Sequence, residues 1–186
     1  MVSPLLLSSL NNPACRPFVD AWLRWRGDAL VPSRAQLDLA EIKRELAMVS
    51  MLELKSPDDV LIRVAGSGIT PFRGVDLTGM NLKDLTPKAD WPLRRYRLMS
   101  LVQHPCGGAL LHEYRESGEL RHAAAMVVLP LRPATPEGNP LLLMQLIRTD
   151  QPGVSPATPA PQGLPIPDEF SFIDIGAGAP ASTEPA

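Results

Sequence analysis

Cysteine is scarce in this sequence, and long apolar runs and an excess of one charge sign are missing. Only Cys15 and Cys106 occur among 186 residues, so they make no disulfide framework, and we expect both to be reduced. The longest apolar stretch, 123–131, is about half of what a membrane-spanning helix needs. The net charge of −2 is far from the basic balance of nucleic-acid-binding domains. We therefore expect neither membrane insertion nor a nucleic-acid partner.

The organisation follows from length and from the uneven use of proline. A chain of 186 residues with 45% hydrophobic residues suits one domain with an appendage. The first residues lack the basic region and the long apolar run of a signal peptide, so we expect a cytoplasmic protein. The expected parts are a flexible N-terminus (1–14), N-terminal helices (15–48), a domain (49–150) and a disordered proline-rich tail (151–186).

The N-terminal helices have clear signals. Phe18, Trp22 and Trp25 fall at helical spacing in 15–27, which predicts an amphipathic helix. A second helix is expected over 39–48, because Asp38 can cap it and Glu41 sits three residues later, as in a capping box.

The rest of the chain is predicted to form five strands and one further helix. The helix is expected over 91–103, where Asp90 can cap it. Five segments have the composition and flanking turns of strands: 49–54, 60–65, 109–115, 121–131 and 140–148.

The glycine-rich segment after the second strand carries a family resemblance. Its pattern is Ala65-Gly66-Ser67-Gly68-Ile69, then Phe72, Gly74 and Asp76-Leu77-Thr78-Gly79, with Trp22, Trp25-Arg26-Gly27, Pro32-Ser33-Arg34 and Asp38 upstream and Leu129-Pro130-Leu131 downstream. This resembles a compact bacterial PAS-domain family of stand-alone proteins. The resemblance implies an α+β fold with a five-stranded antiparallel sheet and helices on one face, and a role as a sensory or regulatory module in bacterial signalling. Ser67 in place of a threonine, and Arg73 before Gly74, depart from the family pattern.

The strand segments 123–131 and 141–147 are apolar on both faces, so both faces must be covered. Phe18, Trp22 and Trp25 are the candidate interface residues for the face that the inter-strand helices leave open. They would pack there within the chain, or a second copy would cover it in a homodimer.

The other face is expected to form a pocket for a small apolar or amphipathic metabolite, and a signalling protein partner would receive the output. Pockets of this kind are mostly apolar with a few polar groups. The candidate pocket residues are Phe72, His112, Tyr114, Met126, Met144 and Gln145. We expect no metal, because the histidines lack ligand spacing. Haem and flavin are not expected either, since neither cysteine lies in a flavin-binding motif.

Two alternatives stay open, although we expect a protein that is not an enzyme. The first is a small enzyme of the cone-shaped α+β class that pairs His112 or Glu113 with Asp76 as acid and base. The second is a ligand-free scaffold for protein interactions, with a packed interior. Residues 170–175 alternate apolar and polar side chains, so they can extend a sheet edge, dock on a partner or remain disordered.

Overall fold

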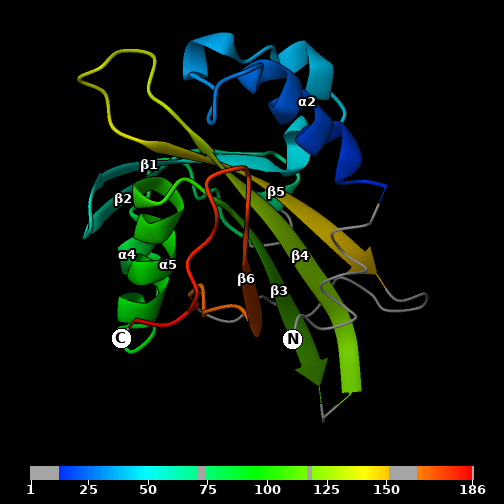
Figure 1. Ribbon diagram of the computed structural model, residues 1–186. Coiled ribbons are helices and arrows are strands. Elements are labelled where there is room, and N and C mark those ends of the chain that lie inside the picture. Colours follow the sequence, from blue (N-terminus) through cyan, green and yellow to red (C-terminus); the bar gives the residue numbers. More distant parts are fainter. Residues whose placement is uncertain (1–12, 71–73, 117–118, 151–162, 186) are drawn as a thin grey trace.

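One antiparallel sheet dominates the computed structural model, which describes residues 13–70, 74–116, 119–150 and 163–185. Within these ranges it has six strands in the order β2-β1-β5-β4-β3-β6 (Figure 1). Their bounds are Val49–Ser56 for β1, Asp59–Ala65 for β2, Gly107–Glu116 for β3, Glu119–Leu131 for β4, Leu141–Asp150 for β5 and Glu169–Ile173 for β6. The predicted α+β fold with an antiparallel sheet is confirmed.

The sixth strand corrects the predicted strand number, and it is the sheet-edge extension that was one alternative for residues 170–175. Residues 163–185 therefore do not fit the disordered tail predicted over 151–186. β6 pairs with β3, from Gly107 opposite Ile173 to Leu111 opposite Glu169. The two glycines at the start of β3 leave room for it, because a Cβ at Gly107 would lie 3.3 Å from Ile173 Cβ. An unpaired edge of β3 would expose its backbone groups, and β6 satisfies them.

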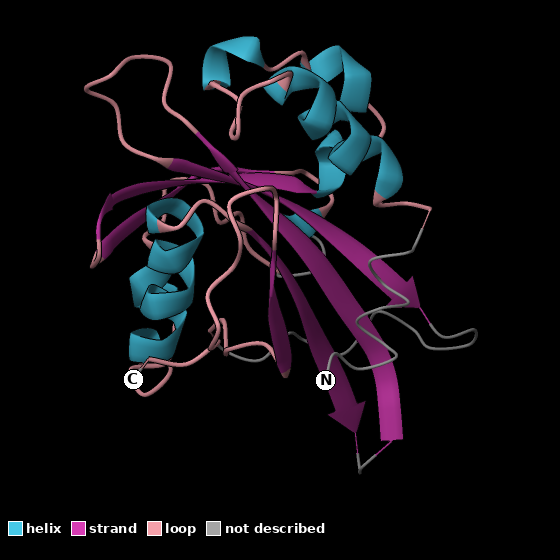
Figure 2. Cartoon of the chain, in the orientation of Figure 1, coloured by secondary structure: helices cyan, strands magenta, loops and turns pink. Residues whose placement is uncertain are grey.

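Helices lie on both sides of the sheet (Figure 2). Helix α2 (Arg16–Arg26) and the short 3-10 helices η1 (Arg34–Gln36), η2 (Leu39–Ile42) and η3 (Leu46–Met48) belong to one side. We call the sheet face that α2 covers the outer face. Helices α4 (Leu82–Leu85) and α5 (Trp91–Gln103) cover the opposite, inner face.

The predicted continuous helix over 39–48 is wrong. Asp38 does cap, since its side chain accepts a hydrogen bond from Ala40 N at 3.0 Å. Glu41, however, forms no capping box, because its carboxylate accepts hydrogen bonds from Arg24 at 2.6 Å and from Trp25 at 3.1 Å. This tertiary use of Glu41 ties the 3-10 segments to α2.

The outer face is covered by the chain's own N-terminal residues. Phe18, Trp22 and Trp25 are 0%, 1% and 5% exposed, and Trp22 Nε1 donates to Pro130 O at 2.9 Å. The strands contribute the outer-face side chains Val49, Met51, Ala109, Leu111, Ala125, Val127, Leu129, Leu131, Leu141, Leu143 and Ile147 to this outer core. The face therefore needs no second copy to cover it.

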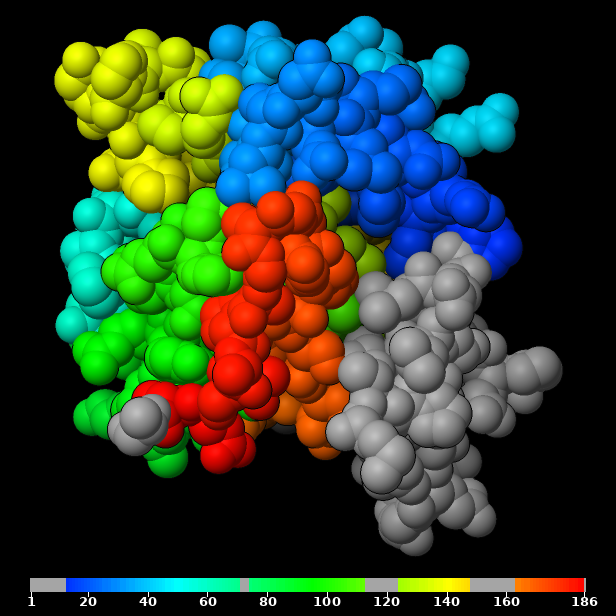
Figure 3. Space-filling view, in the orientation of Figure 1, coloured from blue at the N-terminus to red at the C-terminus, as the bar shows by residue number. Residues whose placement is uncertain are grey.

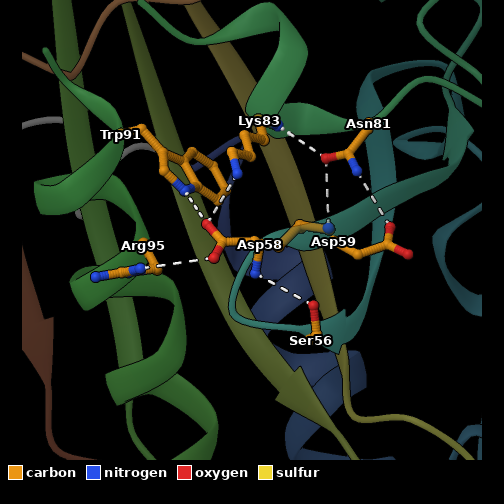
Figure 4. Close-up of polar contacts among 8 residues, drawn as sticks. Ser56, Asp58, Asp59, Asn81, Lys83, Trp91 and Arg95 are labelled. Atoms are coloured by element: carbon orange, nitrogen blue, oxygen red, sulfur yellow. Dashed lines mark hydrogen bonds and ion pairs between the residues drawn. The ribbon is translucent and has the colours of Figure 1, made fainter. Parts of the chain in front are cut away.

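A polar cluster at the β1–β2 turn fixes the helices of the inner face (Figure 4). Asp58 accepts a hydrogen bond from Trp91 Nε1 at 2.8 Å and forms ion pairs with Lys83 at 3.1 Å and Arg95 at 3.7 Å. Asn81 joins the cluster by donating to Asp59 Oδ1 at 3.2 Å. One turn thus contacts both α4 and α5 and sets their position over the sheet.

Candidate functional site

A cavity lies between the inner face of the sheet and the elements that cover it. It has two adjoining compartments of about 100 and 110 Å³. Residues from the strands, from α4 and from the C-terminal residues 163–185 line both compartments. These shared residues are Leu52, Leu82, His112, Met126, Met144 and Leu164.

The lining is mainly apolar, with a few polar groups: His112 lines both compartments, Ser50 lines the first, and Arg94 and Arg97 line the second. Pro165 is among the apolar residues of the first compartment, and Phe170 is among those of the second. An apolar cavity of about 150 Å³ is large enough to hold a molecule such as benzene. Each compartment alone is smaller than that, and the two adjoining compartments together are larger.

Residues 163–185, which we call the C-terminal strap, close this cavity. Their atoms lie directly beside those of α5 on the molecular surface (Figure 3). Leu164 N donates to Leu85 O at 2.6 Å, and Arg94 donates to Pro165 O. Asp90, predicted as the cap of α5, makes no capping hydrogen bond and instead accepts from Ile166 N at 3.3 Å. The side chains before and within α5 therefore hold the strap in place.

The far end of the strap is bound as well. Tyr96 Oη donates to Ser182 O at 3.2 Å, and Arg26 Nη1, from α2 on the outer side, donates to Ile175 O at 2.7 Å. The strap therefore contacts helices from both sides of the sheet.

Arg97 lies where the strap, the helix and the cavity meet. Its Nε donates to Thr183 O at 3.1 Å, and its guanidinium lies 4.8 Å from the centre of the Phe170 ring, within range of a cation–π interaction. Nη1 of Arg97 is buried without a hydrogen-bond partner among the described residues. Burial lowers the pKa of Arg97 below its ordinary value, although the charge of Glu184 acts in the opposite direction.

Three of the predicted pocket residues, His112, Met126 and Met144, line the cavity. Gln145 does not, because neighbouring residues of a strand point to opposite faces. It is buried on the outer side, where its Nε2 donates to Ala14 O at 3.0 Å. Phe72 lies outside the described residues, and so does the side chain of Tyr114.

The remaining predicted residues lie away from the cavity. Phe18, Trp22 and Trp25 are buried in their own chain, so an interface between copies would require other surfaces. Asp76 is exposed and is not among the described residues that line the cavity. Its carboxylate accepts a hydrogen bond from Thr78 N at 2.9 Å, which lowers its pKa.

The predicted pocket residues did not include Arg94, Arg97, Leu164 or Phe170. Arg94 and Arg97 are one helical turn apart, and this spacing places them on the same side of α5. That spacing was the available signal for the arginines. For the strap, it was the alternation of apolar side chains over 170–175.

Among the described residues, no group of three or more His, Cys, Asp or Glu side chains is arranged to hold a metal ion. No helix in the same ranges has the length and hydrophobicity to cross a membrane.

A twisted antiparallel sheet with helices on both sides and a small apolar cavity on its inner face defines an α+β domain. Residues 10–144 match the family model described as PAS domain, and the chain belongs to this family. The strap lies beyond the matched residues. The comparison with curated proteins finds no match. Among solved structures, a fungal LOV domain photoreceptor is similar at 17% identity with a TM-score of 0.36, over 63% of this chain and 95% of that one.

Proposed function

We propose that this PAS domain is a cytoplasmic sensory module of bacterial signalling that binds a small apolar or amphipathic molecule in the cavity. Binding changes the contacts that the module makes with a signalling protein partner. The proposal rests mainly on the apolar cavity, whose wall includes residues from both the sheet and the strap.

The lining supports binding rather than catalysis. Apolar side chains supply most of the wall, and its small number of polar groups would orient a ligand. Asp76, the carboxylate that an acid–base pair with His112 would need, lies in an exposed turn. The second alternative, a ligand-free scaffold, would have its interior filled by side chains.

The strap offers a route from ligand to output. Leu164 and Phe170 line the cavity, and the segment that carries them is hydrogen-bonded to β3, α5 and α2. A ligand can shift the strap only if it binds more tightly to one strap arrangement than to another. Direct contact of the ligand with Leu164 and Phe170 would provide that difference.

The test combines native mass spectrometry with thermal unfolding of the full chain. We expect a co-purifying small molecule, or an increase in Tm with small aromatic compounds such as indole. Met144→Phe, which fills the cavity, should abolish the increase, whereas Met99→Phe should retain it, because Met99 lies on α5 and is not among the described lining residues. A chain that carries no small molecule and shows no change in Tm with any compound would overturn the proposal in favour of a scaffold.

A further inference from the structure

Arg97 has a buried donor for which the described part of the chain supplies no acceptor. Nη1 is enclosed by protein, while Nε is already used by Thr183 O. Buried polar atoms in folded proteins nearly always have a partner, and each exception calls for an explanation. Since Arg97 lines the second compartment, a small shift of its side chain would bring Nη1 within reach of a ligand held there.

The neighbouring arginine shows the contrast. Arg94 lines the same compartment but donates to Thr86 Oγ1 at 3.0 Å and to Pro165 O. Its contacts hold the strap and α4 to α5. Arg97 therefore has the spare donor, and Arg94 has a structural role.

The charge of Arg97 also lacks a close counter-ion. Among the described residues, it forms no ion pair with a carboxylate within 4.0 Å. Glu184 attracts it electrostatically but is exposed. The Phe170 ring contributes a cation–π contact, which is weaker than a desolvated ion pair with good hydrogen-bond geometry. A partly buried cation of this kind favours an anionic ligand.

We propose that the cavity binds a small monocarboxylate with an apolar body of about the size of benzoate. This deepens the proposed function and rests on it. The carboxylate accepts a hydrogen bond from Arg97 Nη1, and the apolar body lies against Met126, Met144 and Leu110. The two N–H groups of the unpartnered Nη1 suit a single carboxylate, whereas a phosphate group would bring more charge and more acceptors than this one nitrogen satisfies.

The occupant is in contact with the strap through Arg97. The same guanidinium holds Thr183 O and stacks on Phe170. A carboxylate bound to Nη1 would neutralise the charge of the Arg97 guanidinium. It would thereby stabilise the position in which the guanidinium contacts Thr183 O and Phe170. The ligand is therefore expected to stabilise the closed position of the strap.

The experiment compares benzoate with its neutral analogue benzamide by isothermal titration calorimetry on the full chain. A charge-assisted hydrogen bond corresponds to a preference of about tenfold or more, so wild type should bind benzoate at least tenfold more tightly. Arg97→Met, which keeps an apolar stem, should lose this preference and still bind benzamide. Arg95→Met is the matched control, because Arg95 is on the same helix but pairs with Asp58 at 3.7 Å; it should bind as wild type does.

The outcomes separate this inference from the proposed function. Equal affinity of wild type for benzoate and benzamide, or an unchanged preference in Arg97→Met, overturns the carboxylate assignment and leaves the apolar cavity as a binding site. Binding of neither compound overturns the carboxylate assignment, and the proposed function is then decided by the native mass spectrometry and thermal unfolding described above. If Arg97→Met does not fold by circular dichroism, Arg97→Lys decides instead: a preference reduced but still present supports the assignment, and an unchanged one overturns it.

Discussion

Trp22 should be among the largest single contributors to stability, because it joins α2 to the sheet. Its side chain is 1% exposed, and Nε1 donates to Pro130 O at 2.9 Å. Truncation of a buried aromatic side chain costs about 3–5 kcal/mol. At about 2–4 °C per kcal/mol for a chain of this size, Trp22→Ala should lower Tm by roughly 6–20 °C.

Trp22→Phe separates the hydrogen bond from the packing. It keeps most of the ring but leaves Pro130 O without its donor, which costs about 1–3 kcal/mol. Leu23→Ala is the control on the same helix, because Leu23 is 44% exposed and surface substitutions change stability by about 0.5 kcal/mol. Thermal unfolding followed by circular dichroism at two protein concentrations gives all three values. If Trp22→Ala were no more destabilising than Leu23→Ala, α2 would not be part of the core.

Three further predictions concern the backbone, the polar cluster and the thiols. Gly66→Ala should destabilise the protein more than Gly79→Ala in urea unfolding, because a Cβ at Gly66 would lie 2.3 Å from a backbone oxygen. Gly79 has open space around it, so only its φ of +83° opposes the substitution, and this strain costs about 1–2 kcal/mol. The reverse order would contradict the packing of the glycine segment. The hydrogen bond from Trp91, followed by that from Lys83, holds the pKa of Asp58 below its ordinary 3.8, so its stabilisation is present above that pH and disappears as pH falls through the folded-state pKa. Asp58→Asn should therefore be less stable than wild type at pH 7 and equal to it in strong acid, and a difference independent of pH would refute this. Burial raises the pKa of both cysteine thiols to about 11, so Ellman's reagent at pH 8 should label neither in the native protein and both in denaturant; rapid labelling of the native protein would contradict their burial.

Much of the sheet could be predicted from sequence because its strands are bounded by strong turn residues. The β1–β2 turn, Ser56-Pro57-Asp58-Asp59, has the composition of a tight connection, and the strands on either side lie where their apolar residues indicated. The amphipathic pattern of α2 was equally clear. Packing of this helix on the outer face of the sheet was one of two predictions, the other being a homodimer through that face.

The 3-10 segments could not be predicted from local sequence. Asp38 and Glu41 have the spacing of a capping box, but the Glu41 carboxylate binds Arg24 and Trp25 instead. A tertiary ion pair therefore outweighs a local helix signal. Sequence alone does not show which partner a carboxylate will select.

The candidate site was predicted only in part, because its lining also depends on tertiary structure. A strand that is apolar on both faces gives no sign of which residues point into a cavity. Met144 and Gln145 are neighbours in β5, and Gln145 pairs with Val127 while Met144 pairs with Val128, so only one of them can line the pocket. The role of Arg97 depends on a backbone carbonyl of the strap, a contact that leaves no pattern in the sequence.

The most direct test of the cavity as a binding site is methyl NMR of the full chain with 13C-labelled methionine. Met126 and Met144 line the cavity, whereas Met51 belongs to the outer core and serves as an internal reference. On titration with benzoate or benzamide, the account predicts that the Met126 and Met144 methyl signals shift together and saturate, while the Met51 signal stays in place. Signals that do not move, or a shift at Met51 alone, would contradict it.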